Sequence, residues 1–444
     1  MLLEKLSPLF IIFAAVKIKP NMLEIQRIRT DKDGILKGLS KRHLHAEETL
    51  DTIIKLDAEW RGAKTEMDGI SAELNQFAKK IGDLYKSGQT VEANALKEKT
   101  TELKANESTL KTKVDSLEAE ITKLLYTLPN VPNEQVVAGR DANDNETVFE
   151  FGSTPTFDFE ALPHWDLAKK YDLIDFELGV KVTGAGFPFY RGKGAKLQRA
   201  LISFFLEEAS KAGYEEIQAP LMVNEASGIG TGQLPDKEGQ MYYMPADDFY
   251  MIPTAEVPLT NIYRDVILPS ADFSIKMTGY TPCFRREAGS YGKDVRGLNR
   301  LHQFDKVEIV RIEHPSNTAK ALEEMMEHVK GLLEKLGLQF RILRLCGGDM
   351  GFASAMTYDF EVYSAAQEKW LEVSSVSRFD TFQANRLKLR FKDEDKKSQL
   401  CHTLNGSALA LPRIVAALLE NHQTADGVII PEVLRAYAGF DKIG

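Results

Sequence analysis

The chain has very little cysteine and lacks the common nucleotide-binding loops. Its 444 residues include three cysteines, Cys283, Cys346 and Cys401. They are widely scattered, with no CxxC spacing and no neighbouring histidine pair, so neither a disulfide framework nor a structural zinc site is expected. There is also no GxGxxG turn and no GxxxxGK[ST] loop, which excludes nucleotide binding by a Rossmann or P-loop cradle.

Long apolar runs are missing as well. The run nearest the start, Leu9 to Val16, is far shorter than the roughly 20 residues that span a bilayer, so no membrane partner is expected. No convincing cleavage site follows it, and a cytoplasmic protein is expected rather than an exported one. Residues 1–21 are interpreted as an N-terminal extension of unknown role, because Met22 looks like a second beginning. A true short extension and a misplaced start codon both stay open.

Basic residues are fewer than acidic ones, 56 Lys and Arg against 65 Asp and Glu. The formal net charge is -9, and 43% of the residues are hydrophobic. A chain of this length can bury a large core in two or three domains. A polyanionic partner would need locally placed Lys and Arg, so composition alone argues mildly against nucleic acid binding.

A seven-residue apolar repeat runs through residues 46–128 and is interrupted only at Ser87-Gly88-Gln89. Two long helices joined by so short a turn must run antiparallel. Each would be roughly 60 Å long at about 1.5 Å per residue, so the pair should project as an arm. The repeat positions are Ile53, Leu56, Trp60, Ala63, Met67, Ile70, Leu74, Phe77, Ile81, Leu84, Leu96, Leu103, Leu110, Leu117 and Leu124.

The repeat by itself carries no sign of RNA binding. Between Lys41 and Leu128 there are 14 Lys and Arg against 16 Asp and Glu, a nearly balanced charge. The pattern alone favours a coiled coil that only dimerises the protein. Any RNA contact would have to use selected faces.

After the linker 129–134 the pattern changes to short strands and helices, and neighbouring strands often lack a helix between them. This predicts an α+β fold: an N-terminal antiparallel helical arm in a domain of residues 22–134, then a domain of residues 135–444 on a mainly antiparallel β-sheet flanked by helices. The predicted helices are Gly194 to Ala212 and Asn317 to Leu336, and the predicted strands are 216–223, 249–252, 307–310, 340–343 and 370–373.

The densest group of functional residues is Thr281 to Ser290, followed after a loop by Arg300 to Glu308. Phe284-Arg285-Arg286-Glu287 resembles motif 2 of the class II aminoacyl-tRNA synthetases. Ala219-Pro220 is similar to the end of motif 1, and Asn405 to Arg413 resembles motif 3. Thr254-Ala255-Glu256 and His402 to Ser407 resemble the seryl members specifically, and the likeness covers roughly Met22 to the C-terminus.

That resemblance implies a class II synthetase domain, a homodimer, ATP and Mg²⁺ as cofactors, and serine as the amino acid. It implies that serine and ATP give seryl-adenylate and pyrophosphate, and that serine then passes to the 3′ end of tRNA(Ser), held by the arm. Whether tRNA(Sec) is also charged stays open. Two other functions would leave different features in the sequence. An amino-acid ligase that loads a carrier protein would lack a tRNA-binding arm. A catalytically inactive scaffold protein would have lost Arg285, Glu287 or Arg413.

The chemistry agrees with two arginines as catalytic groups. Adenylate formation brings a carboxylate up to the α-phosphate, so two anions must be held by fixed cations. Arg285 can bridge the α-phosphate and the serine carboxylate with its planar fork, and Arg413 can take the γ-phosphate. Seen singly, Arg285 and Glu287 could be an ordinary ion pair on a strand.

The resemblance implies the remaining contacts. Glu287 is expected on the adenine amino group, Phe304 stacked on adenine, and Glu372 with Ser375 at the Mg²⁺ ion between the phosphates. Phe304 alone is more often a core residue. Further ATP contacts are Arg286, Leu301, Val373 and Ser374. The serine pocket is implied at Thr254, Ala255, Glu256, Arg285, Glu308 and Ser407.

Three positions depart from the family's usual residues: Val376 for Cys, Asn385 for Arg and Pro412 for Gly. Pro412 fixes its φ and removes an N–H, so the start of the motif 3 helix is expected to differ locally. The loop cations Lys293, Arg296 and Arg300 fit phosphate contacts and solvated surface positions equally well, and are not assigned to the site.

Overall fold

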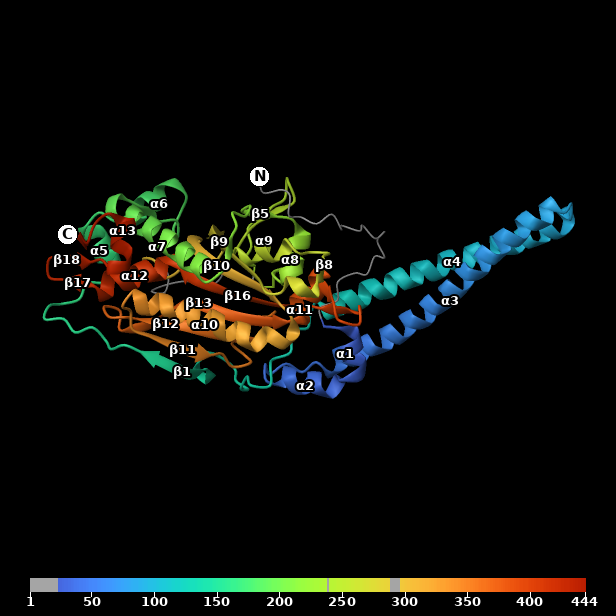
Figure 1. Cartoon of the computed structure of the whole chain (residues 1–444), viewed down its shortest axis with the longest axis horizontal. Helices are drawn as coiled ribbons and strands as arrows, with labels where there is room; N and C mark the ends of the chain where they lie inside the picture. Colours follow the sequence, from blue (N-terminus) through green and yellow to red (C-terminus); the bar gives the residue numbers. More distant parts are fainter. Residues whose placement is uncertain (1–22, 238, 288–295) are drawn as a thin grey trace.

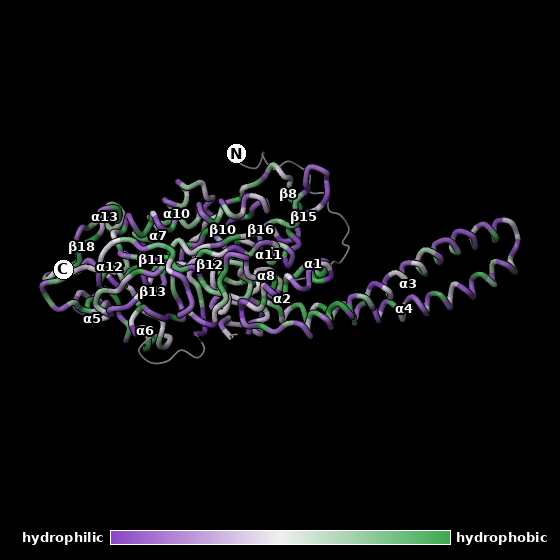
Figure 2. Tube along the Cα trace, turned by 90° about the horizontal axis from the view of Figure 1, so that it is seen from below, coloured by the Kyte–Doolittle hydropathy of each residue, from purple (hydrophilic) through white to green (hydrophobic). Residues whose placement is uncertain are grey.

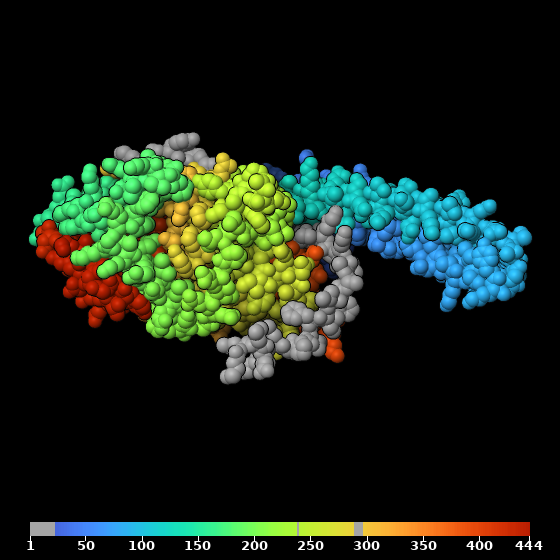
Figure 3. Space-filling model, turned by 90° about the horizontal axis from the view of Figure 1, so that it is seen from above, coloured from blue at the N-terminus to red at the C-terminus, as the bar shows by residue number. Residues whose placement is uncertain are grey.

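The computed structural model describes residues 23–237, 239–287 and 296–444. The chain forms a large α+β body from which a two-helix arm extends (Figure 1). Seen from above, the distal half of the arm stands clear of the body (Figure 3). Among the described residues, no helix combines the length and apolarity needed to cross a membrane.

The arm consists of α3 (Glu47–Lys86) and α4 (Thr90–Leu125), as the heptad repeat predicts. The turn falls at the predicted interruption, where Gly88 has a φ of +77°, a conformation that glycine adopts without strain. Apolar and polar residues alternate along both helices (Figure 2). Tyr85 donates a hydrogen bond across the pair to Asn94 Oδ1 at 2.8 Å, and Ser71 donates to Glu107.

The base of the arm is anchored by its own small core. Helices α1 (Ile25–Thr30) and α2 (Lys32–Ser40) pack there on the lower turns of the arm. Arg42 then connects this domain to the body, because its guanidinium donates to four backbone carbonyls. The buried apolar residues of this core are Leu23, Ile28, Ile35, Leu39, Ala46, Leu50, Ile53, Ile121, Leu125, Leu128, Val131 and Phe382.

An eight-stranded sheet forms the centre of the body, in the order β1-β11-β12-β13-β16-β10-β9-β4. All neighbours in it are antiparallel except β4 and β9, which confirms the predicted mainly antiparallel sheet. Its strands are β1 (Glu146–Phe151), β4 (Glu215–Glu216), β9 (Ile275–Phe284), β10 (Gln303–Glu313), β11 (Phe340–Arg344), β12 (Met356–Ser364), β13 (Lys369–Asp380) and β16 (His402–Ala410).

Three amphipathic helices pack on this sheet: α7 (Gly192–Lys211), α10 (Thr318–Lys335) and α12 (Leu411–Asn421). The first two match the predicted helices to within two residues. Pro412 lies in the first turn of α12, where a missing N–H costs no helical hydrogen bond, so the helix starts normally. Whether this start differs from that of the family's motif 3 helix stays a prediction.

The predicted strand 216–223 is wrong. It divides between β4, which pairs with β9, and β5 (Met222–Val223), which belongs to a separate three-stranded sheet with β7 (Phe249–Met251) and β6 (Tyr243–Met244). Pro220 lies between the two pieces. Since proline has no N–H for a central ladder, the chain leaves the large sheet there.

The other elements are short and connect these layers. The helices are α5 (His164–Lys170), α6 (Phe176–Val182), α8 (Glu225–Thr231), α9 (Glu256–Asn261), α11 (Thr381–Leu387) and α13 (Glu432–Ala438). The strands are β2 (Ile174–Asp175), β3 (Phe189–Tyr190), β8 (Ile267–Pro269), β14 (Arg390–Lys392), β15 (Ser398–Leu400), β17 (Gln423–Thr424), β18 (Gly427–Ile429) and β19 (Lys442–Ile443). Single 3₁₀ turns occur at Ala142–Asp144, Ser270–Asp272 and Pro315–Asn317.

Candidate active site

A pocket opens in the body where β10, β13, β16 and the start of α12 meet the segment that follows β9. It brings together residues that lie more than 100 positions apart in the sequence. Predicted site residues among its walls are Arg285, Glu287, Leu301, Phe304, Glu372, Val373, Ser374, Ser407 and Arg413. Leu298, Asn299, Arg300, Lys306, Ala410 and Pro412 complete it, and none of these six was assigned from the sequence.

Arg285 stands directly after β9, and its guanidinium lies over the ring of Phe304, 5.1 Å from the ring centroid. Its backbone N–H donates to the His302 carbonyl at 2.9 Å, which joins the segment after β9 to the segment before β10. The ring therefore forms a flat, half-buried wall beside a cation. Arg286 follows with its backbone N–H bound to the Gln240 carbonyl, and its side chain is not part of the pocket wall.

Glu287 has a φ of +47°, an uncommon conformation for a non-glycine residue. Its carboxylate forms an ion pair with Arg300, with 2.9 Å between Oε2 and Nη1. The pair joins the two ends of the loop between the strands. Arg300 is thus a pocket residue, whereas Arg296 lies over the ring of Trp165 at 4.5 Å, and Lys293 is outside the described residues.

Arg413, another residue of the pocket wall, projects from the first turn of α12. Its Nη1 donates to the Glu372 carbonyl at 2.6 Å, and its Nε donates to the Asn299 carbonyl at 3.1 Å. The Glu372 carboxylate is 3.8 Å away. The dipole of the α12 N-terminus adds to the positive potential around Arg413, so this part of the pocket suits a polyanion.

Three buried side chains, Lys306, Glu308 and Thr254, form a polar group next to the pocket. Lys306 Nζ is 2.5 Å from Glu308 Oε2 and donates to Thr254 Oγ1 at 2.9 Å. Glu308 is 1% exposed, and a carboxylate buried this deeply needs a cation beside it. Burial raises the pKa of Glu308, and the Lys306 charge works against that rise. The register places Ser407 directly opposite Glu308 in the sheet.

Glu256 lies at the start of α9, beside the same group, and accepts a hydrogen bond from Gln383 Nε2 at 2.6 Å. Burial and the nearby Glu308 charge raise the pKa of Glu256 to about 7. Thr254 and Ala255 are buried just before it. The structure thus gathers all of the predicted serine-binding residues, and it adds Lys306 and Gln383, which the sequence reading missed.

Ser375 differs from its neighbours, because it is not part of the pocket wall. Its hydroxyl donates to Asp359, the residue opposite it on β12. Burial and the Glu372 charge raise the pKa of Asp359 well above its usual range. Asp359 was missed, although the alternation Asp359-Phe360-Glu361 marks a carboxylate face on that strand. Within the described part of the chain, no group of three or more His, Cys, Asp and Glu is arranged to hold a metal ion.

Two of the three departing positions lie outside the pocket wall, whereas Pro412 is part of it, next to Arg413. Val376 is buried and packs toward Gly406, and Asn385 lies within α11. Neither touches the charges assigned to phosphate or serine.

Comparison with known proteins decides the family. Residues 22–132 match the Seryl-tRNA synthetase N-terminal domain, and residues 243–422 match the tRNA synthetase class II core domain (G, H, P, S and T). A serine–tRNA ligase of Salinibacter ruber is 50% identical over 95% of this chain and 99% of its own length. The chain belongs to the seryl-tRNA synthetase family. It is therefore a class II aminoacyl-tRNA synthetase, a ligase that joins serine to tRNA.

Two further relatives agree with this seryl-tRNA synthetase assignment. The serine–tRNA ligase of Akkermansia muciniphila is 43% identical over 95% of this chain and 99% of its own. The structure of the Pyrococcus horikoshii seryl-tRNA synthetase complexed with ATP superposes with a TM-score of 0.87 at 33% identity, covering 95% of this chain and 99% of that one. The body and the arm are thus both part of the shared fold.

Proposed function

We propose that the pocket between Arg285 and Arg413 holds ATP and that the buried group beside it holds serine. The observation that supports this most is the presence of two arginines, Arg285 and Arg413, in the wall of one pocket, with the ring of Phe304 against the first. A triphosphate needs cations spread along its length. Phe304 supplies a flat face for adenine, and Glu287 supplies an acceptor for the adenine amino group.

The first reaction step follows from this placement. The serine carboxylate attacks the α-phosphorus, the bond to the bridging oxygen breaks, and pyrophosphate leaves. Arg285 holds the carboxylate and the α-phosphate together, and Arg413 holds the far phosphates in line. No side chain has to remove a proton, because the attacking carboxylate is already ionised.

The two carboxylates on the serine side of the site, Glu308 and Glu256, have different partners. Lys306 already neutralises Glu308, whereas Glu256 is held by the neutral Gln383 amide. We assign Glu256 to the serine ammonium and Glu308, with Thr254 and Ser407, to the serine hydroxyl. A pocket that hydrogen-bonds the hydroxyl leaves buried groups unpaired when alanine enters, which rejects alanine.

A magnesium ion fits the phosphate end, because the Glu372 carboxylate offers the oxygen ligand that Mg²⁺ prefers. Glu372 and Ser375 would hold it, and the ion would neutralise charge on the β- and γ-phosphates. Arg286, Leu301, Val373 and Ser374 would line the bound nucleotide, and Ala255 would line the serine.

The second step transfers serine to the 3′ end of tRNA(Ser), with AMP as the leaving group. The domain of residues 22–134 binds the tRNA through its arm, and residues 135–444 form the catalytic domain. The arm is close to neutral, so it recognises RNA by shape and a few placed cations. The enzyme acts as a cytoplasmic homodimer. A ligase that loads a carrier protein would have no use for this arm.

The test is serine-dependent exchange of pyrophosphate into ATP by Arg285→Ala. Loss of a cation that acts on the transition state should lower the exchange rate by about 1,000-fold. Arg285→Lys should recover only part of it, because an ammonium lacks the planar fork. Arg435→Ala is the control, since that side chain binds the Ile430 carbonyl far from the pocket. Near-normal exchange in Arg285→Ala would remove Arg285 from the catalytic role.

A further inference from the structure

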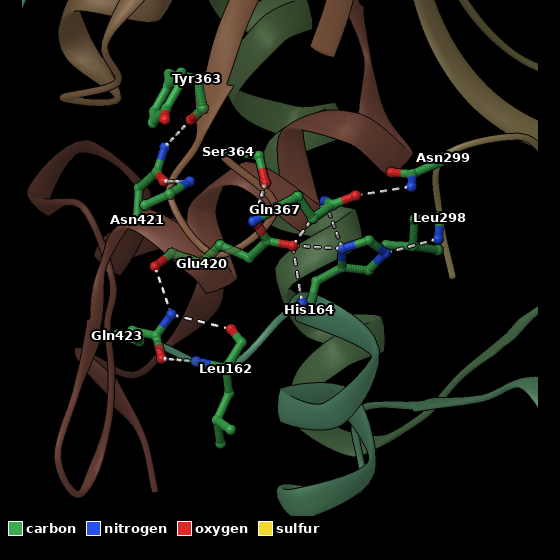
Figure 4. Close-up of polar contacts among 11 residues, drawn as sticks. Leu162, His164, Leu298, Asn299, Tyr363, Ser364, Gln367, Glu420, Asn421 and Gln423 are labelled. Atoms are coloured by element: carbon green, nitrogen blue, oxygen red, sulfur yellow. Dashed lines mark hydrogen bonds and ion pairs between the residues drawn. The ribbon is translucent and has the colours of Figure 1, made fainter. Parts of the chain in front are cut away.

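A buried polar network lies behind the pocket, centred on His164 and Glu420 (Figure 4). His164 is the first residue of α5, and Glu420 is near the end of α12; both side chains are 0% exposed. His164 Nδ1 lies 2.7 Å from Glu420 Oε1, and the His164 backbone N–H donates to the same oxygen at 2.9 Å. Neither residue lines the pocket.

The other ring nitrogen of His164 reaches the pocket wall. The backbone N–H of Leu298 donates to His164 Nε2 at 2.8 Å. Because Nε2 accepts there, the proton of the neutral ring is on Nδ1, which donates to Glu420. Glu420 thereby fixes both the tautomer and the direction of the ring, in the way that outer carboxylates orient histidines in other sites.

The same carboxylate supports the next residue of the wall. Gln367 Nε2 donates to Glu420 Oε1 at 2.9 Å, and Asn299 Nδ2 donates to Gln367 Oε1 at 2.9 Å. The Asn299 carbonyl in turn accepts from Arg413. Since Arg413 and Glu420 are seven residues apart on α12, they lie on one face of that helix. One rigid helix thus holds the wall at two points.

The backbone approaches His164 too closely for any side chain. Gly297 has a φ of +66°, and a Cβ there would lie 2.2 Å from His164 Nε2. Arg296 packs on Trp165, the neighbour of His164. The segment from Arg296 to Asn299 is therefore seated on the start of α5 through ring, backbone and side-chain contacts together.

We propose that His164 is a positioning residue for ATP, because it fixes the pocket wall at Leu298 and Asn299 and, through Asn299, the direction of Arg413. This rests on the proposed assignment of the pocket to ATP. His164 touches no substrate itself. Its effect is on the affinity of the nucleotide and not on the serine group, which is held by bonds among its own residues: Lys306 to Glu308 and Thr254, and Gln383 to Glu256.

Two substitutions test the roles of the two ring nitrogens of His164 separately. In His164→Asn the side-chain amide takes the place of Nδ1 and keeps the bond to Glu420, but Leu298 N–H loses its acceptor. In His164→Gln the amide oxygen takes the place of Nε2 and keeps that acceptor. We expect His164→Asn to raise KM for ATP in the exchange assay about tenfold, the usual effect of one unsatisfied buried N–H. His164→Gln should stay within about threefold of the unmodified enzyme, and KM for serine should not change in either.

His422→Asn is the matched control. That histidine bonds the Leu336 carbonyl from the end of the same helix, at 3.0 Å, and does not reach the pocket wall. Its KM for ATP should be unchanged. Equal KM values for ATP in His164→Asn and His164→Gln, or a parallel rise in KM for serine, would overturn the positioning role.

Arg413→Ala tells the two proposals apart. If it leaves ATP affinity intact, the pocket assignment fails and the role of His164 fails with it. If Arg413→Ala loses ATP affinity while His164→Asn does not, only the role of His164 is overturned.

Discussion

Glu256 and Glu308 lie close together beside the pocket and differ in what holds them. Lys306 is 2.5 Å from Glu308, whereas Glu256 accepts from the Gln383 amide, whose oxygen is fixed by Thr403 at 2.7 Å. Gln383 therefore presents its NH₂ group to Glu256 and cannot neutralise it. Burial and the nearby Glu308 charge raise the pKa of Glu256 to about 7, and the Gln383 hydrogen bond offsets only part of that rise.

The raised pKa predicts a pH dependence of serine binding. Below pH 7 the Glu256 carboxyl carries a proton, which the serine ammonium must displace. We expect KM for serine to rise by about tenfold per pH unit as the pH falls below the pKa, with KM for ATP nearly constant. The measurement is pyrophosphate exchange between pH 5.5 and 8.5, chosen as roughly the range around that pKa.

Glu256→Gln is the matched variant, because it keeps the shape and removes the titration. Its KM for serine should be high and independent of pH. A flat profile in the unmodified enzyme would instead show that Glu256 does not bind the ammonium.

At the scale of single residues, the sequence predicted those that stand in contiguous motifs. Phe304 and Glu287 are examples, and both line the pocket. It missed partners that meet only after folding. Gln383 is 127 positions from Glu256, and His164 is 256 positions from Glu420. Lys306 could have been found, because it is two residues from Glu308 and so shares its face of a strand.

At the scale of elements, the arm was the most predictable part. Its period of seven is carried by many residues, so the helix ends fell within three residues of the predicted limits. The strand 216–223 was not predictable in the same way. Whether a short apolar run stays in one sheet depends on partners such as β7 and β9, which lie outside the run.

The arm's separate role can be tested by shortening it. Removing residues 64–114 and closing the gap with a short Gly-rich turn cuts both helices near one level, judged from the contact between Ser71 and Glu107. The core at the base keeps Ile53 and Ile121. We expect serine-dependent exchange to stay within about twofold, while charging of tRNA(Ser) falls by about 100-fold, equivalent to about 3 kcal/mol of lost tRNA binding.

Circular dichroism of the shortened protein checks that the body is folded. Equal loss of exchange and charging would favour a folding role for the arm over tRNA binding.

At the scale of the whole molecule, the central expectation is a homodimer. Ala219-Pro220, the segment similar to the end of motif 1, leads into the small sheet of β5, β6 and β7. On that sheet Met222 is 51% exposed and Phe249 is 42% exposed. Exposed apolar side chains on neighbouring strands are typical of an interface.

Light scattering should give a mass about twice the 49.8 kDa of one chain. Met222→Asp should shift the protein toward the single-chain mass, because a charge would be buried at the contact. A single-chain mass for the unmodified protein would contradict the homodimer, and an unaffected dimer in Met222→Asp would place the interface elsewhere.

The central claim is that the pocket activates serine for tRNA, and amino-acid-dependent exchange of pyrophosphate into ATP across all of the standard amino acids tests it most directly. The pocket predicts exchange with serine and a rate with alanine lower by about 10⁴-fold, because the groups that bind the hydroxyl would be left unpaired. Charging of total tRNA with serine should follow. Exchange driven best by another amino acid would contradict the account.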